Sequence, residues 1–321
     1  MLHGAASGTS RRAFLGQAAG AAAAVAGAGV GAGALAGSAA AAGHHTYTAG
    51  RFALELGGLP CGALAGVDGG DLSGNVVLDP VGSDQIQRKH IGGVKYEDFT
   101  VQAGSGMGKG FYTWIQDSFD KGYVRKSGAI IAGDFNYNEK SRQSLSNAII
   151  SSVTFPALDG ASKDPAYLAV NISPESVTSS PPSGQPIQAA TQKAWLPANF
   201  VFECDGVDTS RVATIDSFTW TCTVDPADGS FVLDVSDLGV TFPRSSLASW
   251  QRWYAAQNQG VSDERDGVLS LVGANGGGVA TIDLFNLGLF RLSPDPASPA
   301  KRVKAEMYCE QVKFLYKGSG F

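Results

Sequence analysis

The sequence is poor in the side chains that enzymes most often use for catalysis. It holds four histidines in 321 residues, and only His90 lies beyond residue 45. No Gly-x-Ser-x-Gly motif, which marks the nucleophile of many serine hydrolases, is present. A Ser-His-Asp triad needs a histidine held by packed structure. His90 instead follows the cations Arg88 and Lys89, which favours a solvated position on a strand or turn. We therefore predict a protein that is not an enzyme, with an exported hydrolase as an alternative.

Cysteine is also scarce, and its spacing excludes the common metal and redox motifs. The four cysteines form no Cys-x-x-Cys pair, so neither a zinc ribbon nor a thioredoxin-like motif is supported. They fit free buried thiols, which behave as small apolar residues. The alternative is a disulfide between two of Cys204, Cys222 and Cys309, because the leader described below indicates an oxidising destination.

Phosphate-binding and metal-binding loops are missing as well. Residues 104–110 are rich in glycine but lack the Walker spacing, so we predict a flexible loop there. Asp-x-x-Asp-Gly occurs at 225–229 and 263–267, where a calcium loop would need more ligands at alternating positions. Aspartates in such turns bond nearby backbone amides. We predict no cofactor and no metal; a glycosidase-type carboxylate pair stays an alternative for which the sequence selects no residues.

Charge gives no reason to expect a nucleic-acid partner. Charged residues make up 17% of the chain, and the net charge is −5. Apolar residues make up 44%, which is enough for a buried core. Beyond the leader, no apolar run has the length of a membrane span. We expect a mature body that contacts no membrane.

The first 42 residues have the pattern of an export signal. Arg11 and Arg12 form a twin-arginine motif, and a run of alanine, glycine and valine follows. Small residues near 39–42 fit a cleavage site. We predict a twin-arginine (Tat) signal peptide over residues 1–42, and hence an extracytoplasmic or secreted protein. An uncleaved membrane anchor and a merely alanine-rich tail are the alternatives.

Residues 47–177 are predicted to form a first β module around one helix. Apolar residues alternate along residues 51–56, as in a half-buried strand. One helix among six or seven strands favours an antiparallel sandwich or barrel. Helical spacing is shown by four residues: Phe111, Trp114, Ile115 and Phe119.

A candidate hairpin precedes this helix. The basic residues Arg88 and Lys89 lead into a Gly92-Gly93 pair, which we interpret as a turn. A strand follows, in which Val94 and Tyr96 alternate with polar residues.

A second module, residues 192–318, follows a Ser/Pro-rich linker at 178–191. Residues 199–206 parallel residues 51–58, and Ser245-Ser246 precede an aromatic helix face as a candidate N-cap. We interpret this order as a diverged domain duplication. A change of face between Cys309 and Val312 predicts a bulge in the last strand. The predicted fold is mainly β, with two tandem antiparallel β-sandwich or barrel modules that each carry one amphipathic helix.

The order of elements over residues 50–177 resembles the tail-tube family of contractile phages and the inner-tube proteins of related injection systems. The resemblance is carried by an opening strand, an Arg-Lys pair, a Lys-Tyr strand, a helix with tryptophan, an Asn-Ala region and a last strand: Phe52–Leu56, Arg88-Lys89, Lys95-Tyr96, Trp114-Ile115, Asn147-Ala148 and Tyr167–Ile172. The second module lacks a clear counterpart of Arg88-Lys89 and Lys95-Tyr96.

The resemblance implies a structural protein that self-associates into rings or tubes. Rings in the family are sixfold, so two modules in one chain imply a homotrimer that forms a pseudo-hexameric ring. The subunit-contact candidates that follow from it are Arg88, Lys89, Lys95, Tyr96 and, next to the loop before the helix, Lys109. An export leader is unusual for tube subunits. The alternative function is a secreted ligand- or glycan-binding β module without catalytic activity.

Overall fold

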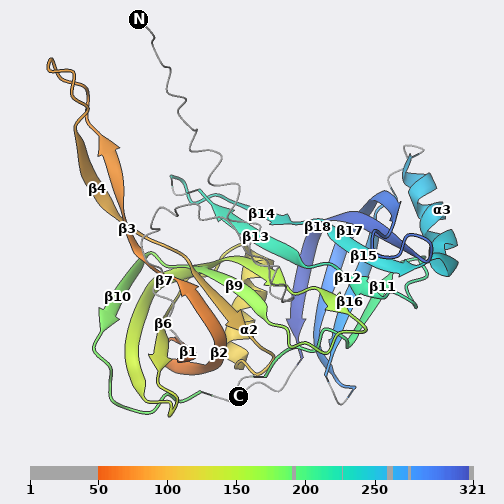
Figure 1. Cartoon of the computed structure of the whole chain (residues 1–321), viewed down its shortest axis with the longest axis horizontal. Coiled ribbons are helices and arrows are strands. Elements are labelled where there is room, and N and C mark those ends of the chain that lie inside the picture. Colours follow the sequence, from red (N-terminus) through yellow and green to blue (C-terminus); the bar gives the residue numbers. More distant parts are fainter. Residues whose placement is uncertain (1–49, 190–192, 226, 259–262, 274–275, 318–321) are drawn as a thin grey trace, which may run out of the picture. The chain divides into compact units, whose positions relative to one another are not determined.

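The structure, a computed structural model, describes residues 50–189, 193–225, 227–258, 263–273 and 276–317. The predicted signal peptide, residues 1–42, lies outside these ranges. The described chain consists mainly of antiparallel strands, which confirms the mainly β part of the predicted fold (Figure 1).

Six strands of the first half close into an antiparallel barrel, as the strand pattern predicts. They follow the order β7-β6-β1-β2-β5-β9, and β9 pairs back onto β7. Alternate residues of β1, among them Phe52 and Leu54, are buried in the core, because successive side chains of a strand point to opposite faces. The barrel strands are β1 (Arg51–Leu56), β2 (Leu59–Gly69), β5 (Phe99–Ala103), β6 (Lys126–Gly133), β7 (Glu139–Phe155) and β9 (Leu168–Ser173).

Strand β7 carries partners from both halves of the chain. β10 (Ser176–Ser180) pairs with its first part, and β13 (Phe218–Val224) pairs with its last part. β14 (Phe231–Val235) pairs with β13 and ends this nine-stranded sheet. The predicted linker thus begins as a strand, and second-half strands extend a first-half sheet. The division into two modules stays a prediction, with strand pairing across its boundary.

The second half forms a seven-stranded antiparallel sheet in the order β11-β16-β17-β18-β15-β12-β8. The end strand β8 comes from the first half. A separate two-stranded sheet consists of β3 (Leu72–Leu78) and β4 (Lys89–Tyr96). The seven strands are β8 (Leu158–Asp159), β11 (Phe200–Cys204), β12 (Thr214–Ile215), β15 (Leu238–Pro243), β16 (Arg265–Val272), β17 (Gly278–Pro294) and β18 (Arg302–Tyr316).

The two halves repeat one order of elements at a nearly constant displacement. β6 and β16 have equal lengths, as do β7 and β17, and each pair is displaced by 139 residues (126 to 265 and 139 to 278). In both long strands one asparagine has a left-handed backbone, Asn147 with φ 47° and Asn286 with φ 53°. Each donates its side-chain amide to a glutamate, Glu175 or Glu310, over 3.2 Å and 2.7 Å respectively. We interpret these matches as traces of the predicted duplication.

One barrel strand has almost no counterpart in the second half. β2 spans eleven residues and joins β1 to β5, whereas β12 spans two residues and pairs with β15 and β8. The counterpart of β1 is β11, and among the described strands it pairs only with β16. The second sheet therefore keeps an open edge at β11.

Helix α2 (Lys109–Lys121) confirms the helix predicted from apolar spacing. All four predicted core residues are buried, and the Trp114 Nε1 group donates to the Val124 carbonyl over 2.7 Å. The second helix, α3 (Leu247–Asn258), buries Trp250 and Trp253. A 3-10 turn, η2 (Arg244–Ser246), precedes it, and the two serines predicted as the N-cap lie in this turn.

The bulge predicted in the last strand is wrong in its position. β18 does change its buried face between Cys309 and Val312, opposite the left-handed Asn286 of β17. The register of the ladder continues through this point and shifts instead between Leu289 and Arg291.

Candidate functional site

The hairpin β3–β4 extends outward from the barrel (Figure 1, orange). It continues the β2–β5 ladder in the same register: Gly69 pairs with Phe99, and after two residues on each strand Leu72 pairs with Tyr96. At the junction Gly69 and Gly70 have φ values of 84° and 80°, which glycine adopts without steric cost. A Cβ at Gly70 would also overlap the Phe99 ring. The hairpin thus leaves the barrel where glycine lets the ladder bend.

One face of this hairpin is apolar and exposed. Residues that are paired directly across two strands share a face, and the pairs here are Leu72 with Tyr96, Gly74 with Val94, Val76 with Ile91 and Leu78 with Lys89. Monomeric proteins rarely expose a continuous apolar patch without a use for it. The large apolar side chains of this face have exposed fractions between 60% and 68%: Leu72, Val76, Leu78, Ile91 and Val94. We call these five residues the hairpin face.

The distal end of the hairpin is held by polar contacts. Arg88 pairs with Asp84 at 2.8 Å, and His90 Nδ1 lies 2.9 Å from Asp79. The Asp79 amide donates to the Arg88 carbonyl over 3.0 Å. Exposed ion pairs of this kind contribute at most about 1 kcal/mol. They orient the connecting loop, and they leave the hairpin face uncovered.

The turn predicted at Gly92-Gly93 is wrong. Both glycines lie inside β4, where the register shifts between the pairs Gly74–Val94 and Val76–Ile91. β4 has one more residue than β3 over this interval, which is a β-bulge. The hairpin turn lies instead between Leu78 and Lys89. The sequence pattern misplaced it because a glycine pair is typical of both features.

The predicted contact residues fall in two places. Arg88 and Lys89 lie at the distal end of the hairpin, and Lys95 and Tyr96 lie at its base. Lys109 is instead the first residue of α2. It lines a hollow of about 380 Å³ together with Lys126 and residues of the β1–β2 turn. The structure therefore groups four of the five candidates on one element and places the fifth elsewhere.

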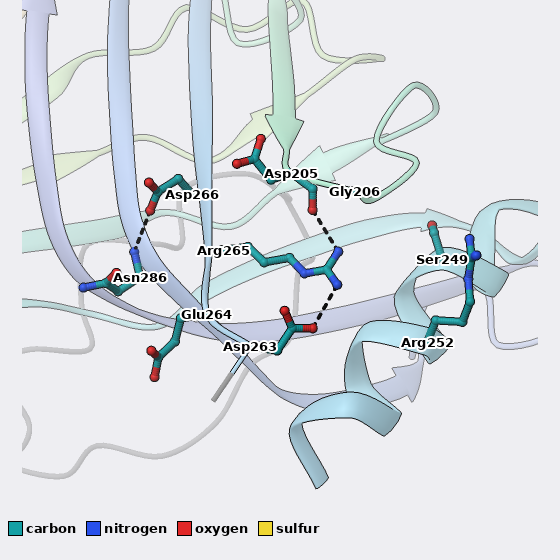
Figure 2. A pocket seen from close by; sticks show the side chains of 9 residues that line it. All are labelled: Asp205, Gly206, Ser249, Arg252, Asp263, Glu264, Arg265, Asp266 and Asn286. Atoms are coloured by element: carbon teal, nitrogen blue, oxygen red, sulfur yellow. Dashed lines mark hydrogen bonds and ion pairs between the residues drawn. The ribbon is translucent and has the colours of Figure 1, made fainter. Parts of the chain in front are cut away.

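A second concave surface lies where β11 and β16 approach α3 (Figure 2), with a volume of about 650 Å³. Arg265 is fully engaged there: its guanidinium donates to the Asp205 carbonyl over 2.8 Å and to the Asp263 carboxylate over 2.9 Å. It also lies 5.1 Å from the ring centroid of Trp253. The pocket is lined by Asp205, Gly206, Ser249, Arg252, Asp263, Glu264, Arg265, Asp266 and Asn286.

Asp266 and Ser249 of this pocket make hydrogen bonds that connect neighbouring segments of the chain. The Asp266 carboxylate accepts the backbone amide of Asn286 over 3.1 Å, a contact between β16 and β17. The Ser249 hydroxyl accepts the Asp208 amide over 2.9 Å and lies 3.5 Å from the Ser246 carbonyl. No histidine is among the described residues that line the pocket, so none of them gives Ser249 an imidazole base of the kind a serine hydrolase uses. The pocket can hold a polar ligand but shows no catalytic set.

Sequence reasoning missed the residues that form the hairpin face. It placed Val94 on a strand and assigned no role to Leu72 or Ile91. Alternating apolar residues normally indicate a face turned to the core, and nothing local marks a strand whose apolar face has no partner. The available signal was the bulge itself, since glycines inside a strand are common next to sites of close approach.

The described chain shows neither a grouped set of metal ligands nor a membrane-spanning helix. Within the ranges given above, no three His, Cys, Asp or Glu side chains are grouped as metal ligands. No helix of the described chain, α2 and α3 included, has the length and apolar character needed to cross a bilayer. No protein-family model matches the chain, and no curated protein sequence matches it.

Proposed function

We propose that this protein is an exported structural subunit of tail-tube-like fold that self-associates into rings or tubes. The hairpin face carries the proposal. Burying one large aliphatic side chain is worth about 1.5–3 kcal/mol, and five such side chains lie exposed on a ribbon with only two strands. An isolated hairpin is marginally stable in water, so a neighbouring molecule that covers this face would stabilise both the hairpin and the contact.

Open sheet edges support the same proposal. β14 ends the first sheet and β11 ends the second. On these two strands Val232 is 67% exposed and Val201 is 50% exposed. An exposed apolar edge strand is a template for pairing with another chain. Closure of such edges in a symmetric ring removes them, and two similar halves per chain favour a homotrimer with pseudo-sixfold symmetry.

Light scattering on the full chain after size exclusion tests the proposal. We expect a mass of three chains or a multiple of three at high micromolar concentration. Val76→Lys and Ile91→Lys, combined in one variant, should shift the mass toward the monomer, because each buries a charge in the proposed contact. Phe135→Lys is the matched control: Phe135 is 69% exposed but lies outside the hairpin, so this variant should assemble normally. A wild-type chain that remains monomeric would sink the proposal.

Export is the second part of the proposal and depends on the leader. Replacing Arg11 and Arg12 by lysine should keep the protein in the cytoplasm of a Tat-competent host. The unchanged leader should deliver it outside, in a form shortened near residue 42. Cell fractionation with mass spectrometry of the released protein measures both. Release of the lysine variant at the normal rate would rule out the twin-arginine route.

The alternative function, a secreted ligand-binding module, has its best support in the pocket around Arg265. Its wall combines the carboxylates of Asp205, Asp263 and Asp266 with the cation of Arg252, a mixture that suits a polar ligand such as a glycan. Saturable glycan binding by a monomeric chain, lost in Arg252→Ala, would favour this alternative over assembly.

A further inference from the structure

The hairpin β3–β4 has a counterpart inside the same chain, namely β13–β14. Both hairpins connect matching strands: β3–β4 lies between β2 and β5, and β13–β14 lies between β12 and β15. Each also continues the ladder that it leaves. Leu72 pairs with Tyr96 in the register of the Gly69–Phe99 pair, and Trp220 pairs with Val235 in the register of the Ile215–Val240 pair.

The displacement is the same for the two strand ends at each junction between hairpin and ladder, but it differs between the two junctions. The end of β2 and the start of β3 both shift by 146 residues to reach the end of β12 and the start of β13 (69 to 215, 72 to 218). The end of β4 and the start of β5 both shift by 139 residues (96 to 235, 99 to 238). The two hairpins therefore occupy equivalent positions in the two halves, but β14 is shorter than β4 and the connection between the two strands is shorter as well.

The second-half hairpin pairs with the last part of β7, and we call the strand edge that receives a hairpin its seat. β13 pairs there from Phe218–Phe155 to Thr221–Ser152. The hydroxyls of Thr219 and Thr154 lie 2.9 Å apart across this contact. Val153 and Phe155 of the seat are buried, with 0% and 2% of their surface exposed. This contact shows what an equivalent hairpin needs: a free strand edge just beyond the left-handed asparagine.

The equivalent edge of the second half has no such partner among the described strands. β17 corresponds to β7, and its last part, Gly288–Pro294, pairs with β18 on one side. On the other side the pairing with β16 ends at Leu287–Arg265. The counterparts of the buried Val153 and Phe155 are Leu292, which is half-buried, and Pro294, which is exposed. A strand pairs with this edge in the first half, whereas no described strand pairs with the equivalent edge in the second half.

We infer that hairpin β3–β4 of one copy adds to the free edge Gly288–Pro294 of β17 in a second copy, in the register that β13 uses on β7. This rests on the proposed self-association and assigns its contact. Transferring the register with the displacements given above places Leu72 opposite the neighbour's Pro294 and Ser73 opposite its Ser293. The serine pair would take the place of the Thr219–Thr154 hydroxyl contact. The occupant is therefore a second copy of this chain.

Such a contact is heterologous, because a hairpin on one copy meets a different surface on the next. Each copy then offers one hairpin and one seat, so the contact repeats until it closes a ring or continues as a filament. Gly74 takes the place of Trp220, so the contact between copies lacks a tryptophan. Backbone pairing and the hairpin face would carry it, a mode known as β-strand addition.

Cysteine cross-linking tests the register. Cα atoms of directly opposed strand residues lie about 4.5–5.5 Å apart, which is within the range of a disulfide. Oxidation of an equal mixture of Ser73→Cys and Ser293→Cys chains should give a disulfide-linked dimer, and either variant alone should give none. The double variant should give a ladder of linked chains. The four native cysteines are buried, so wild-type chain supplies the blank. A linked dimer from Ser73→Cys alone would mean that hairpin meets hairpin, and would overturn the proposal.

Removal of the hairpin separates this inference from the proposed function. Deleting residues 71–97 joins Gly70 to Asp98, which leaves a two-residue turn between the paired Gly69 and Phe99. The barrel should keep its melting temperature, and the chain should become monomeric. If the deleted chain assembles as the wild type does, self-association stands and the hairpin contact is wrong. If wild type is monomeric and no mixture cross-links, both are wrong.

Discussion

Phe119 of α2 stacks on Trp220 of β13, with ring centroids 4.3 Å apart and ring planes that differ by 13°. The helix belongs to the first half of the chain and the strand to the second. Phe314 of β18, also from the second half, lies 6.3 Å from the Phe119 ring. All three rings are buried in one continuous core. Helix α2 of the first half therefore shares its core with strands β13 and β18 of the second half.

Removing one ring of this stack should destabilise the whole described chain. We expect Trp220→Ala to lower the free energy of unfolding by about 3–5 kcal/mol, the cost typical of a buried tryptophan. Urea unfolding followed by far-UV circular dichroism measures it. Phe135→Ala removes an aromatic side chain that is 69% exposed, and should change the free energy by less than about 0.5 kcal/mol. Equal effects of the two variants would contradict a shared core.

The first half should not fold alone. A chain that ends at residue 189 lacks β13, so Phe119 loses its stacking partner and the last part of β7 loses a paired strand. We expect residues 50–189 to bind a dye for exposed apolar surface and to lack near-UV circular dichroism. Adding residues 193–321 as a separate chain should restore both signals. A cooperative unfolding transition of residues 50–189 alone would show instead that the first half is an independent domain.

The sequence predicts those parts of the fold that local periodicity reports. β1 and α2 were predictable because alternation in residues 51–56 and helical spacing from Phe111 to Phe119 each mark a buried face. Pairing of β13 with β7 was not, because Phe218 and Phe155 are far apart in sequence and many apolar strands would fit either edge. Periodicity says that a face is buried, but it does not name the partner.

The candidate site shows the same limit. A strand at Val94 and Tyr96 was predictable from local alternation, but the turn was placed at Gly92-Gly93, so the pairing of this strand with β3 was missed. The hairpin face was missed, because Leu72 and Ile91 alternate as core residues do and only the structure shows them exposed. Equivalence with β13–β14 was equally hidden, because Gly74 and Trp220 occupy the same position in the two hairpins and share no chemistry.

A buried carboxylate should make stability depend on Arg142. Glu139 lies on β7 with its carboxylate 3.0 Å from Arg142 Nε and 2.6 Å from the Ser183 hydroxyl. Arg142 also reaches Glu55 at 3.1 Å. Arg142→Met leaves Glu139 without its cation, and we expect a loss of about 1–3 kcal/mol in unfolding free energy. Arg125→Met, which breaks an exposed pair with Glu175, should cost less than about 0.5 kcal/mol.

The same contact predicts the sign of a pH effect. The hydrogen bond from Arg142, followed by that from Ser183, holds the pKa of Glu139 below its ordinary value. A carboxyl group with a lower pKa in the folded state stabilises the protein above its unfolded pKa, about 4.3. That contribution is lost as the pH falls through the folded value. Glu139→Gln should therefore show a smaller drop in urea midpoint between neutral and acidic pH than wild type. An unchanged drop would assign the acid sensitivity to other groups.

Four free thiols should resist chemical modification until the protein unfolds. All four cysteines are buried and unbonded, which is the free-thiol alternative of the sequence analysis. Burial raises the pKa of Cys204 to about 12 and that of Cys309 to about 11, and it also raises those of Cys61 and Cys222. The thiolate is the reactive form, so at a pH of about 8 almost none is present and reagents cannot reach the sulfur. We expect no reaction with a chromogenic disulfide in the native protein and four equivalents per chain in urea.

The Ser73→Cys variant supplies the positive control, because its added thiol lies on the exposed hairpin and should react at once. A purified wild-type chain with fewer than four reactive thiols in urea would show that export forms a disulfide, which the folded arrangement of these cysteines argues against.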